Sequence, residues 1–342
     1  QLAYGDYILF SLKSACDKSM IYNSIDMFNI WQELPRPLVV MAPMEGVTDI
    51  AFRQLIDEIG RPDLKFSEFV NATGMFSRGS RSVMMSLEYE QSEKPLVAQL
   101  WGTNIDDFRK AAGLVAEKGF DGVDINMGCP VRKIINKGSC SALIKNKSLA
   151  QEIIKAVKEG VGGRIPVSVK TRIGFDQIVT DEWISFLLEC GIDVLTVHGR
   201  TTDEMSSVPC HWDEIGRAVE IRNQMGVNTL IIGNGDVESL DQVKQKVSEY
   251  GVDGVMIGRG VLHNPWVFEG SKFEDHTKEE KINLLRRHAE LFFRYWPNDE
   301  CPFVVLRRFF KIYLRGFVNA NELRDQVMSA RSWEEVERIL GE

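Results

Sequence analysis

Short apolar runs alternate with amphipathic segments along most of the chain. Eight of these runs have the length and β-branched content of buried strands, at residues 37–42, 64–69, 95–100, 122–126, 166–170, 194–198, 229–233 and 254–258. Their starts lie about 25 to 45 residues apart, which leaves room for one helix after each strand. Apolar strands that alternate with helices are typical of a parallel sheet, and eight such units predict a closed (β/α)8 TIM barrel, an α/β fold. An open doubly wound sheet is the alternative, but no G-x-G-x-x-G sequence opens a helix after the first strand.

The strand pattern ends near residue 275, and helical spacing replaces it. Thr277 and Glu280 have the spacing of a capping box. Apolar positions at helical spacing follow on two faces: Leu284, Leu285, Leu291 and Phe292, then Val304, Val305, Phe309 and Ile312. We therefore predict a small all-α helical domain over residues 277–342, joined to the barrel by a polar stretch at residues 270–276.

Residues 1–26 show neither pattern. Met27 begins a stretch that runs directly into the first strand, whereas the chain itself opens with Gln1. We expect residues 1–26 to form an N-terminal extension that is non-native or disordered, and the catalytic barrel domain to occupy residues 27–270.

The composition is that of a soluble globular protein, with 44% hydrophobic and 26% charged residues among 342. No apolar run reaches the roughly 18 residues of a membrane span. The N-terminus also lacks the succession of charged, apolar and small residues that marks a secretory signal peptide. Six cysteines are scattered without a C-x-x-C pair, which argues against a zinc site or a disulfide framework. We expect a cytoplasmic protein in a reducing compartment, without a metal and, by default, a monomer.

Polar residues stand at the end of nearly every predicted strand, where barrel enzymes place their chemistry. The fourth strand ends at Asn126 and runs into a Gly-Cys-Pro turn. A free thiol has a pKa of about 8.5, so Cys129 can exchange a proton near neutral pH. A buried structural cysteine is the alternative interpretation.

The loops after the seventh and eighth strands are rich in glycine. Such loops cradle phosphate in many barrels, because their backbone N–H groups can approach it closely. Gly235, Gly258 and Gly260 would allow that approach, and Arg259 would supply charge. Ordinary turn glycines are the alternative, but the two loops together favour a phosphate site.

The other strand ends suit a flat heterocycle. Gln99 and Asn126 can form hydrogen bonds with the edge of the ring. Lys170, flanked by Arg172, can stabilise a negative charge that develops on a bound ligand. The residues that can pack against its face are Ala42, Pro43 and Met44. A flat ring with a phosphate indicates flavin mononucleotide, whereas Lys170 as a Schiff-base nucleophile is the alternative.

Six motifs follow one another along the barrel. They are M-A-P-M-E-G-V-T-D (41–49), D-I-N-M-G-C-P (124–130), V-K-T-R-I-G (169–174), V-H-G-R-T (197–201), N-G-D (234–236) and G-R-G-x-x-x-N-P-W (258–266). In this order and spacing the chain resembles the tRNA-dihydrouridine synthase family over about residues 31–268. The stretch L-R-R-F-F-K-x-Y-L-R-G-F (306–317) is similar to that family's C-terminal domain.

The resemblance implies a flavin-binding barrel followed by a helical tRNA-binding domain. It implies an enzyme that uses FMN to reduce the C5–C6 double bond of specific uridines in tRNA, with NADPH or NADH as reductant. Cys129 would be the general acid, and Asn126, Arg172 and Arg200 would lie near the substrate base or its backbone. The implied flavin contacts are Gln99, Lys170, His198, Asn234, Gly235, Asp236, Gly258 and Arg259.

One loop departs from the family pattern. Family members usually run K-G-x-G-x-x-L after the cysteine, whereas this chain has Cys140 in place of the second glycine. The shape of this loop on the substrate side is therefore open, and a second thiol would lie near the first.

The net charge of −8 does not by itself favour a nucleic-acid partner. However, residues 278–342 carry 12 basic and 11 acidic residues, whereas the rest of the chain carries 29 and 38. RNA binding needs a local positive face. The residues that we expect to contact tRNA phosphates are Arg307, Arg308, Lys311 and Arg315 in the tail, and Lys133 at the barrel rim.

Three other functions are compatible with parts of this pattern. A flavin barrel acting on a free pyrimidine, similar to dihydroorotate dehydrogenase, would share the phosphate site and the cysteine but would not need a basic helical tail. A Schiff-base aldolase or isomerase would use Lys170 without a flavin. A catalytically inactive tRNA chaperone would not need Cys129 or Lys170, and both are present.

Overall fold

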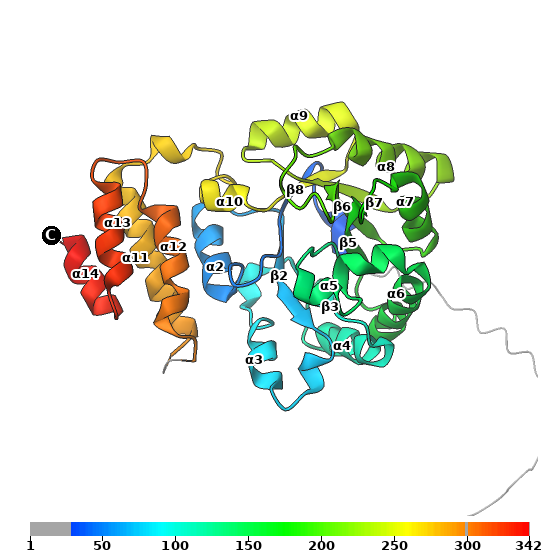
Figure 1. The fold of residues 1–342 in the computed structure, drawn as a ribbon, viewed down its shortest axis with the longest axis horizontal. Coiled ribbons are helices and arrows are strands. Elements are labelled where there is room, and N and C mark those ends of the chain that lie inside the picture. Colours follow the sequence, from blue (N-terminus) through cyan, green and yellow to red (C-terminus); the bar gives the residue numbers. More distant parts are fainter. Residues whose placement is uncertain (1–28, 298–299, 342) are drawn as a thin grey trace, which may run out of the picture.

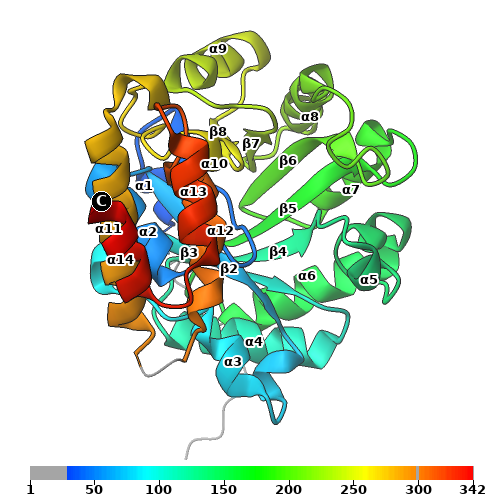
Figure 2. The ribbon, with the colours of Figure 1, turned by 60° about the vertical axis from the view of Figure 1, so that its left-hand side comes forward.

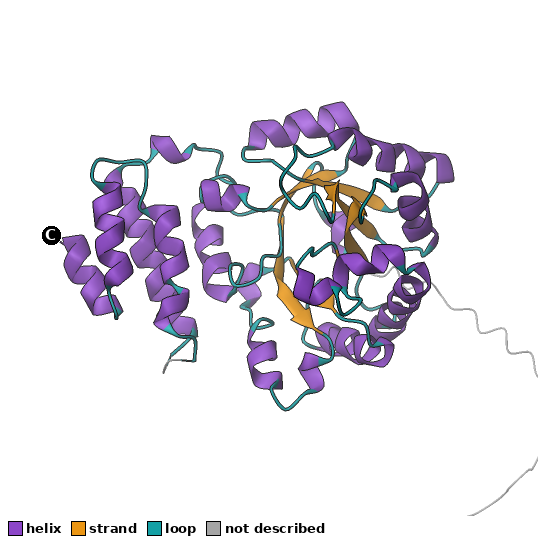
Figure 3. Ribbon diagram, in the orientation of Figure 1, coloured by secondary structure: helices purple, strands orange, loops and turns teal. Residues whose placement is uncertain are grey.

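Eight parallel strands close into a barrel in sequential order in the computed structural model, which describes residues 29–297 and 300–341 (Figure 3). The strands are β1 (Leu38–Met41), β2 (Leu64–Asn71), β3 (Leu96–Trp101), β4 (Gly122–Met127), β5 (Val167–Gly174), β6 (Val194–Thr201), β7 (Leu230–Asn234) and β8 (Gly254–Ile257). The predicted (β/α)8 barrel is confirmed. The expected extension over residues 1–26 lies outside the described residues.

Helices surround the strands (Figure 3). The longer ones are α2 (Ile50–Ile59), α4 (Ile105–Glu117), α6 (Lys147–Val161), α7 (Thr180–Glu189), α8 (Trp212–Met225) and α9 (Leu240–Tyr250). Shorter elements stand beside them: α1 (Ile30–Glu33), α3 (Ser80–Met85), α5 (Arg132–Ile135), α10 (Gly260–His263) and several 3₁₀ turns, among them η3 (Cys140–Lys145). In the part of the chain that the structure describes, no helix is both long and apolar enough to cross a membrane.

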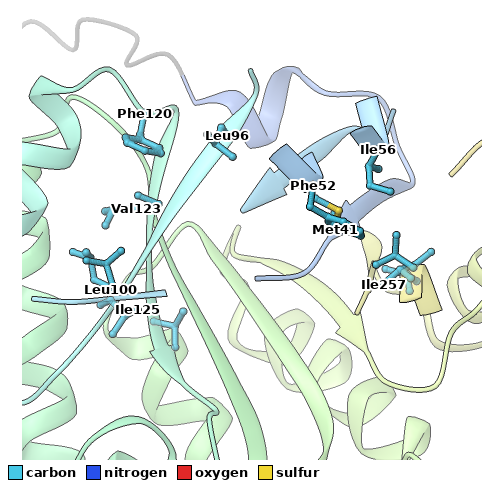
Figure 4. Packing of buried hydrophobic residues seen from close by; sticks show 14 of the residues in the cluster. Met41, Phe52, Ile56, Leu96, Leu100, Phe120, Val123, Ile125 and Ile257 are labelled. Carbon is cyan, nitrogen blue, oxygen red and sulfur yellow. The ribbon is translucent and has the colours of Figure 1, made fainter. Parts of the chain in front are cut away.

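The two faces of the strands have different partners, because side chains alternate along a strand. Outward residues pack against the helices, as Figure 4 shows for Met41 of β1 and Phe52 of α2, both fully buried. Inward residues form a second apolar cluster with Trp31 of α1, which is also fully buried. The inner members from the strands are Leu38, Val40, Leu64, Phe66, Val97, Val194, Ile232 and Met256, and Ala42 directly after β1 joins them.

The same alternation places polar side chains inside the barrel, towards the carboxyl ends of the strands. Val97 is followed two residues later by Gln99, and Ile232 by Asn234. In β5 and β6 the inward polar positions continue further, because both strands run longer than predicted. Arg172 pairs with His198 inside the sheet, so Arg172 and Arg200 lie within strands and not in the loops beyond them.

Four helices at the C-terminus lie together beside the barrel (Figures 1 and 2). They are α11 (Lys278–Tyr295), α12 (Arg307–Tyr313), α13 (Ala320–Ser329) and α14 (Trp333–Gly341). The predicted capping box is present, since Thr277 and Glu280 bond each other's backbone. Val304 is an exception to the predicted apolar face, because its side chain is 59% exposed.

Of these helices, α11 and α12 pack on α2, which lies between the C-terminal helices and the strands in Figure 1. Phe309 of α12 stacks on Phe52 of α2 with ring centroids 5.5 Å apart. Trp296 Nε1 donates a hydrogen bond to Asp49 Oδ2, the N-cap of α2, at 3.1 Å. The tail therefore shares a continuous hydrophobic cluster with the outer face of the barrel.

Candidate functional site

A pocket of about 200 Å³ opens where β1, β5, β6, β7 and β8 end. It is lined by ten of the eleven residues that the sequence predicts for the cofactor: Ala42, Pro43, Met44, Lys170, His198, Asn234, Gly235, Asp236, Gly258 and Arg259. Gln99, the eleventh, is fully buried and does not line the pocket. Gly260, which the sequence predicts for the phosphate loop, also lines the pocket, and the lining residues that the sequence did not predict are Val237, Glu238, Met256 and His263.

Positive charge dominates this pocket. Burial holds the pKa of the His198 imidazole well below 6.5, and four nearby cations act in the same direction: Arg172, Lys170, Arg200 and Arg259. His198 is therefore neutral at pH 7. Asp236 is the carboxylate that balances them, since it accepts a hydrogen bond from Arg200 and lies 3.7 Å from Arg259.

Asp236 stays ionised in spite of its partial burial. Bonds from Arg200 and from the backbone amide of Cys210 outweigh burial and lower the pKa of its carboxyl. Glu238 is the other acidic residue that lines the pocket, and its Oε1 lies 2.6 Å from His263 Nδ1. The site therefore has more positive than negative charge, which suits an anionic ligand.

Lys170 lines the pocket from β5. Its Nζ donates a hydrogen bond to Asn234 Oδ1 at 2.9 Å, and Asn234 Nδ2 donates to the Met256 carbonyl at 2.8 Å. These bonds set the orientation of the Asn234 amide. Burial and the neighbouring Arg172 lower the pKa of Lys170 to about 8, so it remains mostly protonated at pH 7.

A buried chain of hydrogen bonds runs beside the pocket to the cysteine turn. Ser168 Oγ and Gln99 Nε2 donate to the two oxygens of Asp124, at 2.6 and 2.7 Å. Asn126 Nδ2 donates to Gln99 Oε1 at 2.9 Å. Asn126 Oδ1 accepts from the backbone amides of Gly128 and Cys129, at 3.1 and 3.0 Å.

These hydrogen bonds give the side chains of Gln99 and Asn126 partners within the protein. Asp124 was not singled out by the sequence reading, although an acid inside an apolar strand was an available signal. Burial raises the pKa of Asp124 to about 6, against the opposing hydrogen bonds from Ser168 and Gln99. The chain links three strands to the turn that carries Cys129.

Cys129 is partly exposed in the turn after β4. A hydrogen bond from the Cys140 thiol lowers the pKa of Cys129 to about 7, against the effect of burial. Arg172 acts in the same direction, whereas Glu45 opposes it. A thiol with this pKa can give or accept a proton at neutral pH.

The residues predicted for the substrate lie in different surroundings. Arg172 donates to the backbone carbonyls of Gly128 and Thr201 at 2.7 and 2.9 Å, so it ties the cysteine turn to β6. Arg200 lines the pocket beside Asp236. Lys133 is exposed on α5, a few residues beyond Cys129.

The four tail residues predicted for tRNA are not equivalent. Arg308 donates to the Gly46 carbonyl in the loop after β1, and Arg307 donates to the Ala330 carbonyl. Arg315 donates to the Ile312 carbonyl at 3.1 Å and lies 4.0 Å from the Phe273 ring centroid. Lys311 is exposed on α12.

Comparisons with known proteins are consistent among themselves. Residues 40–340 match the family described as Dihydrouridine synthase (Dus). A relative named "Probable tRNA-dihydrouridine synthase" from Staphylococcus aureus (strain COL) is 43% identical over 316 residues, covering 92% of this chain and 95% of its own. A relative named "Probable tRNA-dihydrouridine synthase 2" from Bacillus subtilis (strain 168) is 43% identical over 314 residues, covering 91% and 95%.

A solved structure, histamine dehydrogenase from Rhizobium sp. 4-9, is similar in fold alone. Its TM-score is 0.51 at 13% identity, and the match covers 77% of this chain and 51% of that chain. The likeness supports the barrel architecture and carries nothing about the ligand.

Proposed function

The chain belongs to the dihydrouridine synthase family, and we propose that it reduces the C5–C6 double bond of specific uridines in tRNA. We propose FMN as the bound cofactor and NADPH or NADH as the reductant. The observation that carries this proposal is the pocket at the barrel top, where ten predicted cofactor residues meet beside the strand that leads to Cys129.

The chemistry of the pocket fits a phosphorylated flavin. Arg259 and the backbone at Gly235 and Gly258 would hold the phosphate, because cations there exceed carboxylates. Lys170 and Asn234 would contact the polar edge of the ring, and residues 42–44 would contact its face. When bound, FMN would supply the hydride that reduces the uridine ring.

Cys129 would supply the proton. Its S–H bond breaks as a C–H bond forms at C5 of the uridine, and the thiolate then regains a proton from solvent. A pKa of about 7 suits this role, because a general acid works best when its pKa lies near the operating pH. Arg172 and the buried Asn126 would hold the turn in place.

The C-terminal helices would provide the tRNA-binding domain, residues 277–342, beside a barrel domain over residues 27–270. Arg308 of α12 reaches the Gly46 carbonyl, close to Met44 in the pocket wall. A uridine in folded tRNA must leave its stack to enter such a pocket, which costs about a few kcal/mol. We further propose a cytoplasmic monomer, whose five described cysteines would stay free thiols in a reducing compartment.

A direct test begins with the purified protein. It should be yellow, and denaturation should release FMN, identified by chromatography against FMN and FAD standards. Reduction by NADPH or NADH without oxygen should bleach the flavin, and unmodified tRNA should restore its absorbance and acquire dihydrouridine, measured by mass spectrometry. Free orotate is the matched control substrate. A colourless protein, or reoxidation by orotate and not by tRNA, would overturn the proposal.

A further inference from the structure

Three polar side chains lie side by side on neighbouring strands inside the barrel. The strand register pairs Gln99 of β3 with Asp124 of β4, and Asp124 with Ser168 of β5. Gln99 and Asp124 are fully buried, and Ser168 is 1% exposed. A polar group that merely fills the barrel is the simplest explanation of Asp124. However, a buried carboxylate is costly, and this explanation does not account for where its hydrogen bonds lead.

The carboxylate of Asp124 determines how the Gln99 amide is oriented. Burial raises the pKa of Asp124 to about 6, so the group is mostly ionised at pH 7 and can only accept hydrogen bonds. It accepts from Ser168 Oγ at 2.6 Å and from Gln99 Nε2 at 2.7 Å. Because Gln99 directs its NH2 group to Asp124, its carbonyl oxygen points the other way. That oxygen accepts from Asn126 Nδ2 at 2.9 Å.

The Asn126 amide passes this orientation on to the cysteine turn. With its NH2 group bonded to Gln99, Asn126 directs its carbonyl oxygen to the backbone amides of Gly128 and Cys129, at 3.1 and 3.0 Å. Backbone N–H groups can only donate, so the turn requires an oxygen at this point. The chain of bonds therefore begins at a group that only accepts and ends at two groups that only donate. These two ends allow a single orientation of both amides.

We propose that Asp124 is a positioning residue for the Cys129 turn, whose carboxylate fixes the Gln99 amide and, through it, the Asn126 amide that holds the turn. The hydrogen bonds of Asp124 go to Ser168 and Gln99, so its effect on the turn passes through other side chains. This inference rests on the proposed function for the role of Cys129. No proton is transferred along the chain of bonds.

The test uses the full chain with its cofactor and compares three variants. Asp124→Ala removes the acceptor, which frees the Gln99 amide to rotate. Asp124→Asn is the conservative variant, since its amide oxygen can accept from Gln99 while its NH2 group donates to Ser168 Oγ. Ser168→Ala is the matched control, because it removes the other hydrogen bond of the same carboxylate and leaves Gln99 its acceptor. Asp124→Leu, which fills the site without an acceptor, replaces Asp124→Ala if that variant does not fold.

The readout is hydrogen exchange at the backbone amides of Gly128 and Cys129, resolved by mass spectrometry with fragmentation. Exchange should be about tenfold faster in Asp124→Ala, the size expected for the loss of one hydrogen bond. It should stay near the parent rate in Asp124→Asn and Ser168→Ala. An unchanged rate in Asp124→Ala, or equal acceleration in Asp124→Ala and either of the other variants, would overturn the proposal.

The amides of α9 serve as the internal reference, because this helix contributes no side chain to the chain of bonds. Their exchange should be the same in the parent and in all variants. Equal acceleration at α9 and at the turn in Asp124→Ala would indicate a general loss of stability, and would overturn the proposal as well.

A double-mutant cycle tests whether the effect passes through Gln99. Gln99→Leu removes both the donor to Asp124 and the acceptor of Asn126, so it should by itself accelerate exchange at the turn. Adding Asp124→Ala should then cause no further acceleration, because the route to the turn is already broken. Additive accelerations would overturn the proposed route.

Single turnovers with tRNA separate this inference from the proposed function. Dihydrouridine formation should fall further in Asp124→Ala than in Ser168→Ala. Normal turnover in Cys129→Ala would overturn the catalytic role proposed for Cys129, whereas the exchange rates would still decide whether Asp124 holds the turn. If turnover requires Cys129 and yet keeps the parent rate in Asp124→Ala, the turn needs no such support and the proposal is overturned.

Discussion

Asn126 Oδ1 accepts a hydrogen bond from the backbone amide of Cys129, at 3.0 Å. An inward-facing side chain near the end of β4 therefore shapes the turn that follows its own strand. Asn126 also donates to Gln99, so the position of the turn depends on a buried chain across three strands. The relationship makes Asn126 a support for the thiol.

Asn126→Ala should lower both turnover and stability. It leaves Gln99 Oε1 without its donor inside the barrel, and unpaired buried polar groups cost about 1–3 kcal/mol. Urea unfolding and single-turnover dihydrouridine formation measure the two effects. Asn146→Ala is the control, since Asn146 caps α6 and its loss should cost about 1 kcal/mol without changing turnover. Equal turnover losses in the two variants would argue against a specific role for Asn126.

Cys129→Ala should retain bound flavin and its reduction by NADPH or NADH. Dihydrouridine formation should fall by about 10²–10⁴-fold, as expected for loss of a general acid. In the parent, turnover limited by proton transfer should fall as pH rises through about 7, because the acid must carry its proton. A pH profile of single turnovers checks this, and turnover at the parent rate in the variant would contradict it.

Lys170→Ala and Arg259→Ala should each weaken flavin retention. Each removes a cation from a pocket in which positive charge exceeds negative charge. The ratio of flavin to protein after gel filtration measures the loss. Arg217→Ala is the matched control, because Arg217 pairs with Asp181 on outer helices and its removal should leave the flavin ratio unchanged. Stoichiometric flavin in the Lys170→Ala, Arg259→Ala double variant would refute the assigned site.

Lys311→Glu should weaken tRNA binding and flatten its dependence on salt by about one unit of slope. Lys311 is exposed on α12, whereas neighbouring Arg307 and Arg308 donate to backbone carbonyls. Binding titrations at several salt concentrations give the slope, and the flavin ratio should not change. Lys155→Glu, on the exposed side of α6, is the control of equal charge change. If both variants behave alike, the effect reflects total charge and not a tail contact.

His288 should make the protein less stable in mild acid. Burial lowers the pKa of this imidazole from 6.5 to about 3, so the unfolded chain takes up a proton below pH 6.5 that the folded chain does not. The free energy of unfolding should fall as pH decreases from 6.5 towards 3, by about 2 kcal/mol for this group at pH 5. Urea unfolding at pH 7 and 5 measures the loss, which should be smaller in His288→Gln. An equal loss in both proteins would assign it to other groups.

The sequence alone determined the barrel and most of the pocket wall. Apolar runs at regular spacing predicted eight strands, and all eight were found within a few residues of their predicted bounds. Lys170, His198 and Asn234 could be expected to meet, because the carboxyl ends of neighbouring parallel strands lie at one end of a barrel. The capping box of α11 was also predictable from the sequence, because its two residues are three positions apart and contact each other within one helical turn.

Only the tertiary structure decided which partners these side chains take. Gln99 and Asn126 were predicted from the sequence to contact a ligand, and the structure adds their bonds to Asp124 and to the cysteine turn. Arg308 was predicted from the sequence to contact tRNA, and the structure adds its bond to the loop after β1, 262 residues away in sequence. Periodicity reports which face of an element is buried. It carries no information about long side chains whose partners come from distant elements, because those contacts depend on how the elements pack together.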